Sequence, residues 1–277
     1  MEGGYREASL ASWQSSSAGW AYWSRRLSES AHEVTEWLVA GLELRSGDTV
    51  LELAAGAGET GFHAAASADV RLITTDFAES MLDEARARAA ELGIENVEFR
   101  VLDAERMDLA DHSIDGVLCR YGYMLMADPA RAFRETRRVL RPGRRVALAT
   151  WTHADRNPWT LIGRLLVERG ALPPPGPGTP GICALPDAAS VEPLLDAAGF
   201  TGVEAAEFDF VLDYPGFEGY WDFVSRAAGA VAGVIAAMPP DDRAELRREL
   251  AEQVARFLEP DGSLAFPASS LAVAATA

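Results

Sequence analysis

Short apolar runs alternate with segments of helical periodicity from residue 48 to residue 151. The apolar runs predict strands; they are DTVLELAA, VRLITTD, VEFRVLDA, SIDGVLCRYGYM and RRVALATW. Helices are predicted over GFHAAAS, ESMLDEARARAAELG and PARAFRETRRVLRPG. Strands that alternate with helices are typical of a parallel sheet covered on both faces. The pattern therefore predicts an α/β fold with a doubly wound, mainly parallel sheet.

Two helical regions accompany this sheet. Residues 1–46 are rich in aromatic residues and predict an amphipathic N-terminal helical cover. Beyond Trp151, helices are predicted around a Pro/Gly loop at residues 171–181 and again between residues 216 and 258, with a break at Pro239. The strands VEAAEFDFVLD and SSLAVAATA complete the sheet. We expect a cover at 1–46 and a main domain at 47–277, with helical insertions at about 152–200 and 216–260.

Net charge narrows the range of partners. The chain carries 42 acidic and 25 basic residues, a net charge of −17. Phosphate backbones and anionic membranes both require a basic face, so we expect neither nucleic acid nor membrane as a partner. No apolar run is long enough for a spanning helix, and the N-terminus has no signal-peptide pattern, so we expect a cytoplasmic protein.

The basic residues are all arginine, and the chain has no lysine. Schiff-base chemistry and the P-loop lysine are thereby excluded. Two cysteines and four histidines show no metal-ligand spacing, so we predict no metal site. The chemistry must come from other residues.

A glycine-rich turn follows the first predicted strand in VLELAAGAGETG, residues 50–61. Gly56, Gly58 and Gly61 fit the spacing G-x-G-x-x-G, and Asp76 follows 18 residues after Gly58. This spacing is known from dinucleotide-binding dehydrogenases, but methyltransferases can open in the same way.

Three observations favour the second alternative. Glu52, inside the first strand, would repel a pyrophosphate but suits a ligand with a positive charge. The third strand also ends on an acid, Asp103, which can accept a hydrogen bond from an exocyclic amine. A second mononucleotide-binding half is missing, since a helical cover follows the first.

The combination resembles the class I S-adenosylmethionine-dependent methyltransferases, in particular the small-molecule group of the ubiquinone/menaquinone type (methyltransferase type 11). The resemblance is carried by LELAAGAG and the acids that end the strands, and it covers residues 45–152 most strongly. It implies a seven-stranded Rossmann-like sheet with an antiparallel last strand, and S-adenosylmethionine as cofactor.

The resemblance also assigns cofactor positions. It gives Glu52 to the methionine ammonium, Asp76 to the ribose hydroxyls, and Asp103 with Ala104 to the adenine amine. Arg120 is expected beside the methionine moiety, mainly through its backbone. The full set of expected cofactor-binding residues is Glu52, Ala54, Gly56, Gly58, Asp76, Phe77, Met81, Asp103, Ala104 and Arg120.

Candidate residues for the substrate pocket and for catalysis follow from their positions along the chain. Open α/β sheets bind ligands at the carboxyl ends of their strands, so aromatic residues near that edge and in the N-terminal cover are candidates for a substrate pocket. They are Trp20, Trp23, Tyr121, Tyr123, Met124 and Trp159. His153, which follows the fifth strand, is the first candidate for a general base, and His32 is the second.

We therefore predict methyl transfer from S-adenosylmethionine to a small-molecule acceptor, by in-line displacement. A natural product or a quinone-like aromatic compound is a candidate acceptor. An NAD-dependent oxidoreductase and a catalytically silent S-adenosylmethionine-binding protein remain as alternatives. The acceptor, the methylated atom and the oligomeric state stay open.

Overall fold

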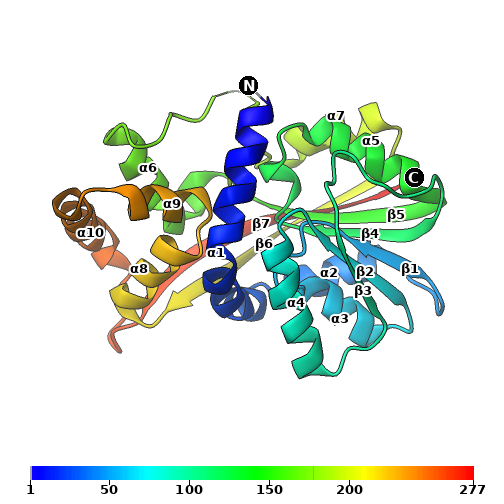
Figure 1. Ribbon diagram of the computed structural model, residues 1–277, viewed down its shortest axis with the longest axis horizontal. Helices are drawn as coiled ribbons and strands as arrows, with labels where there is room; N and C mark the ends of the chain where they lie inside the picture. Colours follow the sequence, from blue (N-terminus) through cyan, green and yellow to red (C-terminus); the bar gives the residue numbers. More distant parts are fainter. Residues whose placement is uncertain (1, 177) are drawn as a thin grey trace.

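A seven-stranded sheet runs through the computed structural model, with helices on both faces (Figure 1). The structure describes residues 2–176 and 178–277. The strand order is β3-β2-β1-β4-β5-β7-β6. Strand β7 is antiparallel to both of its neighbours, and the other strand pairs are parallel. The predicted fold is confirmed, including the antiparallel last strand.

The strands and helices have the following bounds. The strands are β1 (Thr49–Glu52), β2 (Arg71–Asp76), β3 (Val97–Val101), β4 (Ile114–Arg120), β5 (Leu140–Trp151), β6 (Thr201–Tyr214) and β7 (Leu264–Thr276). The α-helices are α1 (Glu2–Ser30), α2 (His32–Gly41), α3 (Glu59–Ser67), α4 (Glu79–Leu92), α5 (Pro129–Val139), α6 (Leu161–Glu168), α7 (Ala188–Ala198), α8 (Gly216–Arg226), α9 (Ala230–Ala237) and α10 (Pro240–Val254). Short 3-10 helices are η1 (Tyr123–Leu125), η2 (Ala154–Arg156), η3 (Pro158–Thr160) and η4 (Ala255–Phe257).

The helices divide into two layers and a separate group. Figure 1 shows α2, α3 and α4 on one side of the sheet and α5 and α7 on the other. Helices α6, α8, α9 and α10 form a group at one end, and α1 runs between this group and the sheet. The N-terminal cover is thus helical, as expected, while the domain boundary near residue 46 stays a prediction.

The strand register brings the expected site to one edge of the sheet. Glu52 at the end of β1 is aligned with Thr74 of β2 on one side and with Leu118 of β4 on the other. Because the three strands are parallel, their carboxyl ends lie together at this edge. The polar residues that follow β1, β2 and β4 are therefore neighbours in space.

Strand β4 ends earlier than the sequence pattern indicates. The apolar run was expected to continue as strand to Met124, but Tyr121 has a φ of +62°. This left-handed conformation is rare for a residue with a side chain, and it turns the chain out of the sheet. Residues Tyr123–Leu125 form η1 instead.

Asn157 joins the segment after β5 to strand β7. Its side chain has no exposed surface. The amide group donates to Thr152 Oγ1 and to the carbonyls of His153 and Ser269, and its oxygen accepts from the Ser269 N–H and from Trp159 Nε1. An N-cap role, which the sequence RNPW suggests, is not made, since the side chain gives η3 no cap hydrogen bond.

We expect Asn157→Ala to lower the free energy of unfolding by about 2–3 kcal/mol, because buried partner groups lose their hydrogen bonds. Urea denaturation followed by circular dichroism measures this loss. Asn96→Ala is the matched control: Asn96 is exposed and its side chain makes one hydrogen bond, to Val70 O. Equal losses in the two variants would contradict the role given to Asn157.

Candidate functional site

The turn between β1 and α3 depends on its glycines. Gly56 and Gly58 have φ angles of +55° and +82°. A Cβ atom added to Gly58 would lie 2.5 Å from the Phe62 ring, and one added to Gly56 would lie 2.5 Å from Trp20 Nε1. Ala54 also has a positive φ, +50°. The backbone at these positions is thus forced into a tight loop that keeps its surface free of side chains.

Glu52 lies beneath this turn and is almost completely buried. Oε1 accepts a hydrogen bond from Gly61 N at 2.7 Å, and Oε2 accepts one from Thr74 Oγ1 at 3.1 Å. A Cβ on Gly61 would lie 2.2 Å from Oε2, so glycine is needed there. Burial raises the pKa of Glu52 to about 7, although both hydrogen bonds act in the opposite direction. The carboxylate faces α3 and β2, and any effect on a ligand ammonium acts through the turn.

Asp76 ties the turn to the end of β2. Oδ2 accepts from Gly56 N at 3.0 Å, and Oδ1 accepts from Ala78 N at 2.9 Å. Burial raises the pKa of Asp76 to about 6. Each carboxylate oxygen retains a second lone pair, so the group can accept further hydrogen bonds from ribose hydroxyls.

The remaining expected adenine contacts lie around the ends of β2 and β3. Asp103 is partly exposed, and Arg6 of α1 pairs with both Asp103 and Glu105. Phe77 and Ala104 are partly buried, whereas Met81 is buried in the first turn of α4. The acid that the resemblance gives to the adenine amine thus has an arginine as its present partner.

Helix α1 crosses the ligand edge of the sheet. At its start, Tyr5 donates to Leu125 O at 2.9 Å. In its middle, the carbonyl of Gln14 accepts from Ser80 Oγ at 3.3 Å. Further along, Trp20 covers Gly56 and meets Trp13 edge to face at 5.8 Å. Helix α1 therefore lies directly against the glycine turn and the start of α4.

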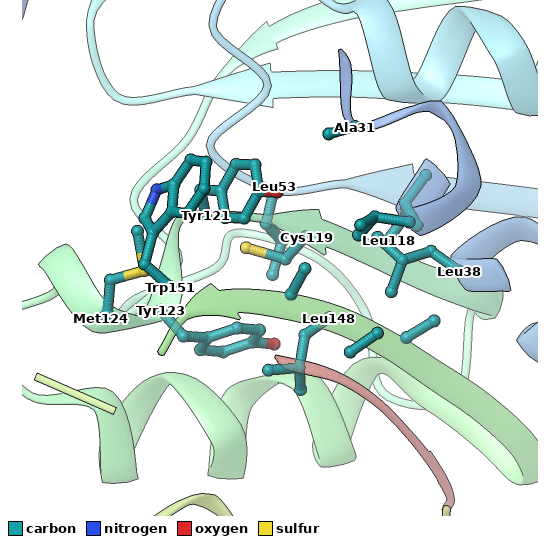
Figure 2. Packing of buried hydrophobic residues seen from close by; sticks show 14 of the residues in the cluster. Ala31, Leu38, Leu53, Leu118, Cys119, Tyr121, Tyr123, Met124, Leu148 and Trp151 are labelled. Carbon is teal, nitrogen blue, oxygen red and sulfur yellow. The ribbon is translucent and has the colours of Figure 1, made fainter. Parts of the chain in front are cut away.

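Aromatic side chains line the edge beyond β4 and β5. The rings of Tyr121 and Trp151 are stacked at 4.3 Å with an interplanar angle of 10°, and Figure 2 shows them side by side with Met124 near them. The Tyr121 hydroxyl is 2.8 Å from Ser270 Oγ. Trp159 meets Trp151 edge to face at 4.8 Å. Three of the expected pocket residues, Tyr121, Met124 and Trp159, thus lie in one group.

Two other expected pocket residues are directed elsewhere. Tyr123 has no exposed surface, stacks on Phe133 of α5 at 4.1 Å and bonds Thr136 Oγ1 through its hydroxyl. In Figure 2 its ring lies apart from Tyr121 and Trp151. Trp23 donates to Asp222 Oδ2 of α8 at 2.9 Å. The structure does not bring these two side chains to the group around Tyr121.

The histidines occupy two different places. His153 is 58% exposed at its side chain and lies 3.3 Å from Asp187, the N-cap residue of α7. His32 Nε2 lies 3.1 Å from Glu36 Oε1. The rings of His32 and His63 meet edge to face, with their centroids 5.7 Å apart. Sequence reasoning missed the His32–His63 pair, because the two residues belong to different helices.

A cavity of about 170 Å³ lies beside this pair, between α1, α2, α3 and α4. Its lining is polar throughout: Arg25, Ser28, Glu29, His32, Thr35, Glu59, His63 and Arg88. Glu59 directly follows the glycine turn, and Thr35 bonds Arg120. The cavity thus adjoins the predicted cofactor site at the β1 and β4 ends.

Comparison with known proteins identifies the domain. A family model described as a methyltransferase domain matches residues 44–168. Within these residues the chain has a class I S-adenosylmethionine-dependent methyltransferase domain. The match decides between the two nucleotide ligands that the glycine turn left open, and the cofactor of this fold is S-adenosylmethionine.

Relatives of the methyltransferase domain differ in their acceptors. An arsenite methyltransferase of Halobacterium salinarum is 32% identical over 181 residues, which are 61% of this chain and 42% of that protein. A ubiquinone/menaquinone biosynthesis C-methyltransferase of Acidiphilium cryptum is 38% identical over 108 residues, which are 39% of this chain and 43% of that protein. The chain therefore spans less than half the length of either relative.

A solved structure has the same fold over most of the chain. The YcgJ protein of Bacillus subtilis superimposes with a TM-score of 0.61 at 20% identity, and the match covers 88% of this chain and 98% of that one. Within the described residues of the methyltransferase, no helix is both long and apolar enough to cross a membrane. The same residues contain no group of three metal-ligating side chains, and the absence of a metal stays a prediction.

The raised pKa of Glu52 predicts how stability depends on pH. Between pH 4.5 and about 7 the folded state binds more protons than the unfolded state, so stability falls as pH rises through this window. Glu52→Gln removes the charge, keeps an oxygen that accepts from Gly61 N, and offers an NH2 group that can donate to Thr74 Oγ1. We expect it to remove a decline on the order of 3 kcal/mol.

Denaturant titrations at pH 5 and pH 8 measure this difference. Glu252→Gln, at an exposed position on α10, is the control for a change of net charge. A pH dependence that is the same in Glu52→Gln as in the wild type would refute the assignment.

The ion pairs of Arg6 with Asp103 and Glu105 predict which part of α1 they stabilise against local unfolding. Loss of its pair with Asp103 and Glu105 should raise amide hydrogen exchange in the N-terminal half of α1. We expect Arg6→Ala to increase exchange over residues 4–16, measured by mass spectrometry. Arg25→Ala removes an exposed pair with Glu91 near the other end and should leave residues 4–16 unchanged. If Arg6→Ala and Arg25→Ala give the same hydrogen-exchange profile, Arg6 does not stabilise residues 4–16.

Proposed function

We propose that this protein transfers the methyl group of S-adenosylmethionine to a small-molecule acceptor. The observation that carries the proposal is the arrangement at the edge of the sheet. A turn of alanines and glycines follows β1, the buried Asp76 closes on that turn, and a second acid follows β3. This arrangement lies on the strand order β3-β2-β1-β4-β5-β7-β6, and the described residues form no second mononucleotide-binding half.

The cofactor fits the described residues in its general chemistry. The backbone at Ala54, Gly56 and Gly58 leaves a surface on which a nucleoside can lie closely. Asp76 has lone pairs for the ribose hydroxyls, and Asp103 with Ala104 lies where an adenine amine can bind. Phe77 and Met81 flank the same region. Arg6 and Trp20 cover parts of it, so binding includes a displacement of α1.

The chemistry that the cofactor supplies is an activated methyl group on a sulfonium. The main task of the protein is then to align the acceptor atom with the S–CH₃ bond and to exclude water. Helix α1 is in a position to close the site. The stacked Tyr121 and Trp151 and the nearby Trp159 present aromatic rings close to the end of β4, and such rings favour a cation.

The same aromatic group supports an acceptor with an apolar or aromatic surface. The relatives include an arsenite and a quinone methyltransferase, and the stacked rings favour the second kind of acceptor here. We propose Tyr121, Met124 and Trp159, with Trp20 from α1, as the acceptor side. A role of Tyr123 or Trp23 there requires a rearrangement of their present packing.

Two histidines are candidates for a general base. His153 is exposed and paired with Asp187, whereas His32 lines the polar cavity and pairs with Glu36. A general base contributes about 10²- to 10⁴-fold. If His153→Ala lowers the methylation rate by less than this, alignment of the acceptor is the main source of the rate enhancement.

Isothermal titration calorimetry tests the proposed function. We expect micromolar binding of S-adenosylmethionine and S-adenosylhomocysteine and no binding of NAD. Asp76→Ala should weaken binding by about 1–3 kcal/mol, the usual range for lost hydrogen bonds to a carboxylate. Asp83→Ala, exposed on α4, is the matched control.

A screen of phenols, quinols, amines and thiols with radiolabelled cofactor then tests turnover. Binding of NAD in preference to S-adenosylmethionine would favour an oxidoreductase. Cofactor binding without turnover in any class would favour a silent binding protein.

A further inference from the structure

Arg120 lies at the ligand edge without a carboxylate partner, unlike Arg6 and Arg88 nearby. It is the last residue of β4 and is partly buried. Its only hydrogen bond among the described residues runs from Nη1 to Thr35 Oγ1, at 3.0 Å. No described carboxylate lies within 4 Å of its guanidinium nitrogens. In a chain with 42 acidic residues, an unpaired arginine at such a place is unexpected.

The surrounding groups do not neutralise this charge. Glu52 and Glu59 are close enough to influence the pKa of Arg120, but their carboxylates are engaged elsewhere. Glu52 accepts from Gly61 and Thr74, and Glu59 pairs with Arg88. Burial lowers the pKa of Arg120, so the folded protein holds this cation at a cost.

The guanidinium is also held in position. Thr35 is buried, and its hydroxyl fixes one end of the planar group. The guanidinium carbon lies 5.6 Å from the centre of the Tyr121 ring. None of the Arg120 nitrogens is enclosed without a partner, in contrast to Nε of Arg145 and of Arg169. Its remaining N–H groups therefore keep access to a ligand.

We propose that Arg120 binds the α-carboxylate of the cofactor's methionine moiety through its side chain, and that Thr35 positions the guanidinium. The inference rests on the proposed function. The family resemblance implies mainly a backbone contact at this position, and the side-chain role proposed here rests on the geometry of this chain. A guanidinium can bind a carboxylate with two parallel hydrogen bonds, which a lysine cannot do.

The charges of the cofactor agree with this assignment. Its methionine end carries an ammonium and a carboxylate at the same carbon. Glu52 places negative charge beneath the turn, and Arg120 places positive charge at the end of the neighbouring strand, with which β1 is aligned from Val50 to Glu52. Thr35 also lines the polar cavity between α1 and α4, where a hydrated charged end is compatible with its lining.

The test compares two ligands that differ only in this carboxylate. Calorimetry measures the affinities of S-adenosylhomocysteine and of its decarboxylated analogue, 5′-deoxy-5′-(3-aminopropylthio)adenosine. For the wild type we expect a preference of about 10- to 100-fold for the carboxylate form, the range of a charge-assisted hydrogen bond. In Arg120→Gln this preference should fall to about one, while the affinity for the analogue changes little.

Two further variants separate charge from position. Arg120→Lys keeps the charge without the planar fork, and Thr35→Val removes the hydroxyl that orients it; both should keep only part of the preference. Arg71→Gln is the matched control, because Arg71 is already paired with Glu98 at the opposite edge of the sheet, and it should keep the full preference. Circular dichroism establishes that each variant is folded.

The outcomes distinguish this inference from the proposed function. If the wild type binds neither ligand, the proposed function itself fails. If it binds both ligands equally, or if Arg120→Gln loses affinity for both in equal measure, the carboxylate assignment is overturned. A preference that survives in Arg120→Gln while transfer to acidic acceptors is lost would assign the arginine to an acceptor carboxylate instead, and this also overturns the proposal.

Discussion

Two buried carboxylates hold the glycine turn in its shape. Asp76 accepts from the N–H of Gly56 at the front of the turn, and Glu52 accepts from the N–H of Gly61 behind it. Both acids are costly to bury, since burial raises the pKa of each. The backbone N–H groups of Gly56 and Gly61 need these acceptors. Without them the loop could not leave β1, pass close to a ligand and enter α3.

The position of helix α1 depends on the same turn. A side chain at Gly56 would collide with Trp20, so the absence of a Cβ that admits a nucleoside also admits the indole. Arg6, at the other end of the helix, pairs with the acid that follows β3. Side chains of α1 thus contact part of the proposed ligand surface. The cofactor then exchanges protein contacts for ligand contacts, which links cofactor affinity to the stability of α1.

The sequence predicted the sheet and the acids at its edge because both depend on local pattern. Apolar runs with helical segments between them define strand order once the resemblance is known, and Glu52, Asp76 and Asp103 lie at the strand ends. The direction of Tyr123 was not predictable, since alternation along a strand no longer applies after the positive φ of Tyr121.

Sequence patterns also could not predict contacts between segments that lie far apart along the chain. Arg6 and Glu105 are 99 residues apart, and neither has a neighbour that marks it as half of a pair. The hydrogen bonds of Asn157 follow from the approach of β7 to the segment after β5, so a reading of Asn-Pro as a helix start could not reveal them. Local periodicity contains no information on such approaches.

The positive charge of Arg120 at the end of β4 bears on how the cofactor is oriented. The cofactor brings a sulfonium and an ammonium to a protein with a net charge of −17, so long-range attraction already favours it. A single cation at this edge would oppose the sulfonium unless an anion lies against it. The cofactor supplies that anion at the far end of its own methionine chain. An arginine held by Thr35 can therefore select the orientation in which the carboxylate reaches β4, and the sulfonium then lies away from the guanidinium.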